Sequence, residues 1–197
     1  MTTLRAFLSP FNVIAAGLLV AVLVLQSLLG RPDAPINQLP REGGKPTTVT
    51  VALHYPTAAL DRETAPNATV GLPSADTSLD AAATLVAARW LKGAQGGGAT
   101  PRLLPVTATA PTIVVRYGTA YVNLPENWRG LGGGSEVEWW TVCGLANTLF
   151  GLQGPTPDGG EPPRIASVLY LIGGQAAGTL AGHVDLSQPF TPAVCKS

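Results

Sequence analysis

The sequence predicts a small α+β domain with a mixed sheet and two helices, preceded by one transmembrane helix. Three observations lead to this prediction: a long apolar run near the N-terminus, two later segments whose apolar residues recur at helical spacing, and several short segments rich in β-branched residues. The chain has 197 residues, and the part after an anchor and a linker is long enough for one domain with its own core. The expected order within the domain is β-α-β-β-β-α-β-β.

The N-terminal apolar run is predicted to cross a membrane. Residues 11–29 are apolar apart from a few polar side chains, and as a helix they would rise roughly 28 Å, close to the hydrocarbon thickness of a bilayer. A cleaved signal peptide is the alternative, but cleavage after Gly30 would place Leu28 where the peptidase requires a small residue. Because Arg5 is the single basic residue of a very short flank, we expect residues 1–30 to be a retained, single-pass signal-anchor in the cytoplasmic membrane, with the domain on the extracytoplasmic side.

A linker is predicted between the anchor and the domain. Residues 31–47 are rich in proline and contain Gly43-Gly44, which predicts an extended tether before a domain over residues 48–197.

The charge balance argues against a nucleic-acid partner. Lys plus Arg and Asp plus Glu each number 12, so no excess of positive charge would attract nucleic acid. We therefore expect no nucleic-acid partner.

Cys143 and Cys195 are the only cysteines. They lack the close spacing of a zinc site, and only His54 and His183 could add imidazole ligands, so no metal or other cofactor is expected. In an oxidising compartment they could form one disulfide if their Cα atoms approach within about 7 Å. The alternative is two unpaired residues.

The domain is predicted to open with a strand, a loop and a helix. Residues 48–55 are rich in β-branched side chains and predict the first strand, and the polar residues 56–78 predict a long loop. Apolar residues then recur at helical spacing from Leu79 until Gly93, with Thr77 expected to mark the start of this helix.

Three short strands are predicted next, over residues 103–109, 112–117 and 120–124, with a hairpin turn at Gly118-Thr119. A further strand is predicted over residues 165–172. A tight turn at Gly173-Gly174 should lead from it into a weaker strand over residues 175–180.

The second helix is predicted from its ends. Ser135 and Glu138 have the spacing of a capping box, and Gly151 is expected to end the helix in a left-handed conformation. Glu136 and Glu138 lie two apart and so point to different faces, which argues against a carboxylate pair for glycan cleavage.

Three segments carry the most specific pattern: Leu145-Ala146-Asn147-Thr148-Leu149, Val168-Leu169-Tyr170-Leu171-Ile172 and Gly182-His183-Val184-Asp185-Leu186-Ser187-Gln188-Pro189. Together with the strand around Asn123, this pattern over residues 48–192 resembles the GerMN domain of the bacterial sporulation and germination protein GerM and of many envelope proteins. The resemblance implies a compact α+β fold and a role in assembling or supporting an envelope complex rather than catalysis. Asn123 stands where family members commonly have Asp, and Gly173-Gly174 stands where they have Asp-Gly.

His183, Asp185 and Ser187 would suggest a hydrolase if they shared one strand face. Their order and spacing are not those of a nucleophile elbow, and Asp is a habitual backbone partner in turns. We therefore expect His183 and Asp185, like the motif residues Asn123 and Asn147, to have structural roles, and the protein not to be an enzyme.

The aromatic residues suggest where a partner would bind. Trp128, Trp139 and Tyr121 are the predicted contact surface. The first hypothesis is a membrane-tethered module that binds other envelope proteins, or a second copy of itself, through its sheet edge or around Trp128 and Trp139. The second is a binder of peptidoglycan or another cell-wall ligand that uses Trp128 and Tyr121, and the third is the hydrolase.

Overall fold

The structure is a computed structural model that describes residues 45–96, 100–155 and 160–196, all of which belong to one compact unit over residues 43–197. The predicted membrane span, residues 11–29, lies outside the described residues, as does most of the predicted linker. None of the described helices is long and apolar enough to cross a membrane.

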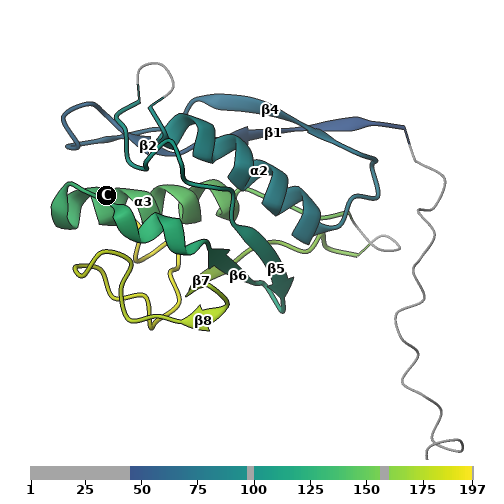
Figure 1. The fold of residues 1–197 in the computed structure, drawn as a ribbon. Coiled ribbons are helices and arrows are strands. Elements are labelled where there is room, and N and C mark those ends of the chain that lie inside the picture. Colours follow the sequence, from purple (N-terminus) through teal and green to yellow (C-terminus); the bar gives the residue numbers. More distant parts are fainter. Residues whose placement is uncertain (1–44, 97–99, 156–159, 197) are drawn as a thin grey trace, which may run out of the picture. The chain divides into compact units, whose positions relative to one another are not determined.

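The described part contains two α-helices, one 3₁₀-helix and three small sheets (Figure 1). The elements in chain order are β1 (Thr47–Ala52), β2 (Tyr55–Pro56), β3 (Glu63–Thr64), β4 (Asn67–Leu72), α2 (Leu79–Ala94), β5 (Thr112–Arg116), β6 (Thr119–Leu124), the 3₁₀-helix η2 (Glu126–Gly130), α3 (Gly134–Phe150), β7 (Ser167–Ile172) and β8 (Gln175–Ala176).

The main sheet is mixed, as predicted, with the strand order β5-β6-β7-β8. The β5–β6 and β7–β8 pairs are antiparallel, whereas β6 and β7 are parallel. A parallel pair needs a long crossover connection, and α3 lies in that connection. The α+β class is therefore confirmed.

One face of this sheet forms the core. The residues that point to it are buried along each strand, because side chains alternate between the two faces; they include Ile113, Ala120, Val122, Leu124, Val168, Tyr170 and Ile172. Trp90 of α2 fills the centre of the core. Its ring stacks on Tyr55 at 5.8 Å between centroids and on Trp128 at 6.3 Å.

The predicted loop over residues 56–78 is wrong, because it contains β3 and β4. β4 pairs antiparallel with β1, from Thr47 opposite Leu72 to Ala52 opposite Asn67. Ala68 and Val70 of β4 are buried and their neighbours exposed. This alternation is the sequence signal of a strand, but it is short and its apolar residues are small.

The predicted strand over residues 103–109 is also wrong. The backbone N–H groups of Leu103 and Leu104 both donate to the carbonyl oxygen of Ala94, at 2.7 and 3.0 Å. This segment therefore binds the last turn of α2 instead of pairing with a strand. The long first strand is divided for a similar reason: the backbone of His54, between β1 and β2, bonds to both helices.

Three of the predicted turns and caps differ from those in the structure, and one agrees. Ser78, not Thr77, caps α2, since its Oγ accepts from the Ala81 N–H. The hairpin turn lies at Tyr117-Gly118, one residue before the predicted position, with positive φ at both residues. Gly151 follows α3 with a right-handed φ of −75°, so the predicted left-handed ending is absent. The Gly173-Gly174 turn has positive φ at both residues, as a tight hairpin turn requires.

Candidate functional site

The segment after β8 covers one side of α3. Leu180, Leu186, Phe190 and Cys195 are buried along it. Phe190 exchanges two backbone hydrogen bonds with Val168 of β7, at 2.7 and 2.8 Å. The segment ends at a disulfide between Cys195 and Cys143 of α3, with 5.2 Å between the Cα atoms. A stretch with little regular structure is thus held at several points.

Glu138 makes the first of these attachments. Its side chain is fully buried, and its Oε1 accepts from the N–H groups of Leu180 and Ala181 at 2.9 and 2.8 Å. Its Oε2 accepts from the His183 N–H at 2.9 Å. Gly182 has a φ of +100°, a conformation that glycine adopts easily, and it lies within the turn whose N–H groups meet at the carboxylate.

The predicted capping role of Ser135 and Glu138 is therefore wrong. Gly133 takes the cap position with a φ of +107°, and no side chain caps α3. Because α3 starts at Gly134, Glu138 lies just beyond the first turn and faces the C-terminal segment.

A groove of about 330 Å³ lies between α3 and this segment. Trp139, the residue after Glu138, contributes an indole ring that is partly exposed. Phe190 and Val194 add apolar surface, and His183, Asp185 and Gln188 add an imidazole, a carboxylate and an amide. The groove therefore combines an aromatic surface with polar side chains at its border.

Asp185 is held in a defined turn at this border. Its Oδ1 accepts from the Ser187 N–H at 2.8 Å. Hydrogen bonds from the side chain and the backbone of Ser187 hold the pKa of the exposed Asp185 carboxyl below its ordinary value. Neither His183 nor Asp185 lies on a strand, so the strand-face arrangement considered for a hydrolase is absent.

A second cleft, of about 340 Å³, lies further along α3 and is lined by His54, Glu63, Asn147, Phe150 and Lys196, among others. Trp139, Cys143 and Asn147 are spaced four residues apart, so they lie on one side of α3 with about 6 Å of rise between them. The disulfide thus lies between the two clefts along the helix.

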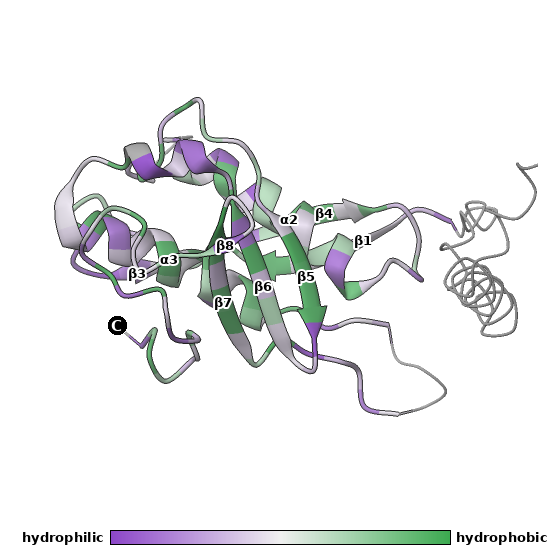
Figure 2. Cartoon of the chain, turned by 60° about the horizontal axis from the view of Figure 1, so that its bottom comes forward, coloured by the Kyte–Doolittle hydropathy of each residue, from purple (hydrophilic) through white to green (hydrophobic). Residues whose placement is uncertain are grey.

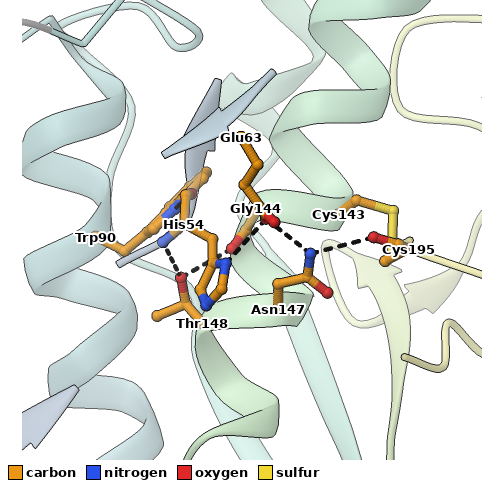
Figure 3. A network of polar contacts seen from close by, with 8 residues as sticks. All are labelled: His54, Glu63, Trp90, Cys143, Gly144, Asn147, Thr148 and Cys195. Atoms are coloured by element: carbon orange, nitrogen blue, oxygen red, sulfur yellow. Dashed lines mark hydrogen bonds and ion pairs between the residues drawn. A yellow bond between two sulfur atoms is a disulfide. The ribbon is translucent and has the colours of Figure 1, made fainter. Parts of the chain in front are cut away.

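The second cleft contains a network of hydrogen bonds (Figure 3). Glu63 Oε1 lies 2.9 Å from His54 Nδ1 and accepts from Asn147 Nδ2 at 2.9 Å. Asn147 Nδ2 also donates to the carbonyl oxygen of Cys195 at 3.2 Å. Because a carboxylate only accepts, Nδ1 of His54 is the donor in its hydrogen bond with Glu63.

The backbone beneath this network is tightly packed. The His54 N–H donates to Thr148 Oγ1, and the His54 carbonyl oxygen accepts from the Trp90 indole at 2.8 Å. A Cβ on Gly144 would lie 2.8 Å from that carbonyl oxygen, so α3 needs glycine here. Thr148 Oγ1 donates to the Gly144 carbonyl oxygen, so this hydroxyl is not positioned by the imidazole as a nucleophile would be. The network joins α2, β3, α3 and His54, which lies between β1 and β2.

The structure separates the predicted contact residues. Trp128 is not available for contact, because it is fully buried and its indole donates to the Thr109 carbonyl oxygen at 2.8 Å. Tyr121 lies on β6 and is 38% exposed, and Trp139 lies in the groove described above. Asn123 Oδ1 accepts from the Gly174 N–H at 2.6 Å and so holds the β7–β8 turn.

Sequence reasoning missed Glu138, Glu63 and His54 as organising residues. Glu138 had a usable signal, since an acidic side chain between Val137 and two tryptophans lies in a strongly apolar helix. Glu63 and His54 had none, because their partners are distant in sequence. Among the described residues, no group of three or more His, Cys, Asp or Glu side chains could hold a metal ion.

The second face of the main sheet is open. Val114, Tyr121 and Leu169 lie side by side in register on β5, β6 and β7. Val114 is 43% exposed and Tyr121 38% exposed, and Figure 2 views the sheet from the side that the two helices leave uncovered. This row is an apolar patch on the open face of the sheet.

The outer edge of β5 is closed by α2. The Ile113 N–H donates to Thr84 Oγ1 at 3.2 Å, and the Val115 N–H donates to Asp80 Oδ1 at 2.9 Å. Two donors that an added strand would need are thereby occupied. The predicted use of a sheet edge is disfavoured at β5.

Comparison with known proteins leaves the family unassigned. No protein-family model matches the chain, and no curated protein matches it. A crystal structure described as "putative lipoprotein from Clostridium perfringens" is similar, with a TM-score of 0.43 and 18% sequence identity, covering 74% of this chain and 89% of that one. The GerMN resemblance stays a prediction, and function is argued below from this chain's own residues.

Proposed function

We propose that this protein is a membrane-anchored, non-catalytic module that binds another envelope protein through the open face of its main sheet, and so supports the assembly of a cell-envelope complex. The observation that carries the proposal is the row of Val114, Tyr121 and Leu169. Val114 and Tyr121 are exposed and Leu169 beside them is partly exposed, and a contiguous apolar patch of this kind is typical of protein interaction sites.

The charge of this face favours a protein partner. The strands β5, β6 and β7 together carry one charged side chain, that of Arg116. It lies at the end of β5 and is paired with Asp80 of α2 at 3.2 Å. The face is therefore apolar and nearly neutral, which suits the buried centre of a protein interface. The closed edge of β5 favours contact through side chains over strand addition.

The extracytoplasmic location rests on two features. The disulfide between Cys143 and Cys195 is of a kind that persists in oxidising compartments. The apolar run at residues 11–29 has the length of a membrane span. Both support a domain held at the outer side of the cytoplasmic membrane.

The test is site-specific photocrosslinking in native membranes of the source organism. A benzophenone amino acid replaces Tyr121 in the full-length protein, and the control places it at Leu85 of α2, which is 36% exposed and so is matched in accessibility. We expect one defined envelope protein to be crosslinked from position 121 and not from position 85. Crosslinks to a second copy of the chain, identical products from both positions, or none would refute the proposal.

A further inference from the structure

The groove beside Trp139 combines a partly exposed indole with polar side chains, and the packing of the fold does not explain this combination. We propose that it binds one uncharged pyranose ring of a glycan, with the ring against the indole of Trp139 and its hydroxyl groups bonded to Asp185, Gln188 and His183. This inference concerns a different surface from the open sheet face and does not depend on it.

Trp139 is the tryptophan whose polar atom is left available. The indole N–H groups of Trp90, Trp128 and Trp140 each donate to a backbone carbonyl oxygen at 2.8 to 2.9 Å. Trp139 Nε1 has no acceptor within the part of the chain that the structure describes. Every buried side-chain nitrogen and oxygen of that part is hydrogen-bonded, so Nε1 of Trp139 is accessible to solvent.

The border of the groove can bond hydroxyl groups in both directions. Asp185 offers an acceptor, while the amide of Gln188 and the imidazole of His183 each offer a donor and an acceptor. A sugar hydroxyl is itself both a donor and an acceptor. An apolar face on the indole and polar groups around it match the two kinds of surface that a pyranose ring presents.

The groove is built before any ligand binds. Glu138 fixes the backbone at His183, Ser187 fixes the carboxylate of Asp185, and β7 fixes Phe190. Fewer groups must be ordered on binding, which lowers its entropic cost. The volume of about 330 Å³ lies at the small end of ligand pockets, which fits one ring.

Other ligands match this chemistry less well. An anion would meet Asp185, and the converging backbone N–H groups nearby already bind Glu138. A cation would use the indole and the carboxylate, but it cannot accept from Gln188 or His183. An apolar peptide side chain would form no hydrogen bond with any of the three polar groups.

The test measures binding of chitotetraose, a neutral tetrasaccharide of N-acetylglucosamine, by titration calorimetry and tryptophan fluorescence. The full-length protein is kept in a detergent without a sugar headgroup, so that the detergent cannot occupy the groove. We expect saturable binding with a change in tryptophan emission, and at least about tenfold weaker binding for Trp139→Ala and for Asp185→Asn. The matched control, Tyr117→Ala at an exposed tyrosine in the β5–β6 turn, should bind like the native protein.

Each contrary result overturns the proposal. Native protein without saturable binding at about 10 mM chitotetraose has no such site. Unchanged affinity in Trp139→Ala, with a native circular dichroism spectrum, places the sugar elsewhere. If Trp139→Ala does not fold, Asp185→Asn decides alone, because its exposed side chain can be changed without disturbing the core. Saturable binding of a quaternary ammonium salt in place of the sugar would show a cation site.

Discussion

Replacement of Glu138 by glutamine would test whether the buried carboxylate holds the C-terminal segment on α3. The carboxylate accepts three backbone hydrogen bonds, two at Oε1 and one at Oε2. Glutamine has nearly the same shape, but its amide group offers one oxygen and two N–H donors. The substitution therefore changes hydrogen bonding while leaving the packing nearly constant.

The expected loss follows from those three bonds. Hydrogen bonds to a charged group contribute about 1.5–3 kcal/mol each and neutral ones about 0.5–1.5 kcal/mol. The two bonds to the remaining oxygen would each weaken by about 1 kcal/mol, and the third would be replaced by two donors facing each other at His183. Relief from burying a charge offsets part of this, so we expect a net loss of about 2–3 kcal/mol.

This loss is measurable by urea unfolding. A domain of this size has a stability of about 5–15 kcal/mol, and with an m-value of about 1–3 kcal/mol/M the midpoint should fall by about 0.7–3 M. Glu136→Gln is the control, because Glu136 is exposed two residues earlier on the same helix. Amide exchange at Leu180, Ala181 and His183 should accelerate in Glu138→Gln alone. Equal midpoints for the two variants, or unchanged exchange at the three amides, would refute the reasoning.

Three further predictions concern stability. Gly144→Ala should destabilise the fold by at least about 1 kcal/mol in urea unfolding, because its Cβ would lie 2.8 Å from a backbone oxygen. The control Gly151→Ala, whose Cβ has its nearest contact at 3.9 Å, should be neutral or stabilising. A greater loss of stability in Gly151→Ala than in Gly144→Ala would contradict the packing. Reduction of the disulfide, whose cysteines are 52 residues apart, should cost about 2–4 kcal/mol; an unchanged Tm after complete thiol labelling would argue against this. Burial raises the pKa of Tyr55 to about 12 from 10.0, so as the pH rises this tyrosine ionises first in the unfolded chain. The free energy of unfolding should therefore be constant below pH 10 and fall by about 2–3 kcal/mol towards pH 12. A urea midpoint that stays level over this range would show that burial does not raise the pKa of Tyr55.

Elements with dense local signals were predicted well. The start of α2 at Leu79, the strands β5, β6 and β7, and the Gly173-Gly174 turn follow from periodicity and turn chemistry in neighbouring residues. β4 was missed, and residues 103–109 were assigned to a strand, because in both segments a partner elsewhere in the chain decides the conformation. β1 pairs with β4, and Ala94 of α2 binds the backbone at Leu103 and Leu104.

The same distinction applies to the candidate sites. The sequence pointed to Trp128, Trp139 and Tyr121 by residue type, which says that a side chain is large and aromatic but not which surface it occupies. Trp128 became core because the Thr109 carbonyl oxygen and the ring of Trp90 enclose it. Trp139 stayed partly exposed because a groove remains between α3 and the C-terminal segment at this position.

The α+β class, the apolar run with the length of a membrane span and the neutral charge balance can be read from the chain alone, because each is a property of composition or of neighbouring residues. Three features depend on the folded domain: the buried Glu138 carboxylate binds the C-terminal segment, Cys143 is bonded to Cys195, and His183 and Asp185 share a groove with Trp139. These residues come together through the parallel crossover and the returning C-terminal segment. The free energy of such contacts depends on the packing of the whole domain, which local patterns do not contain.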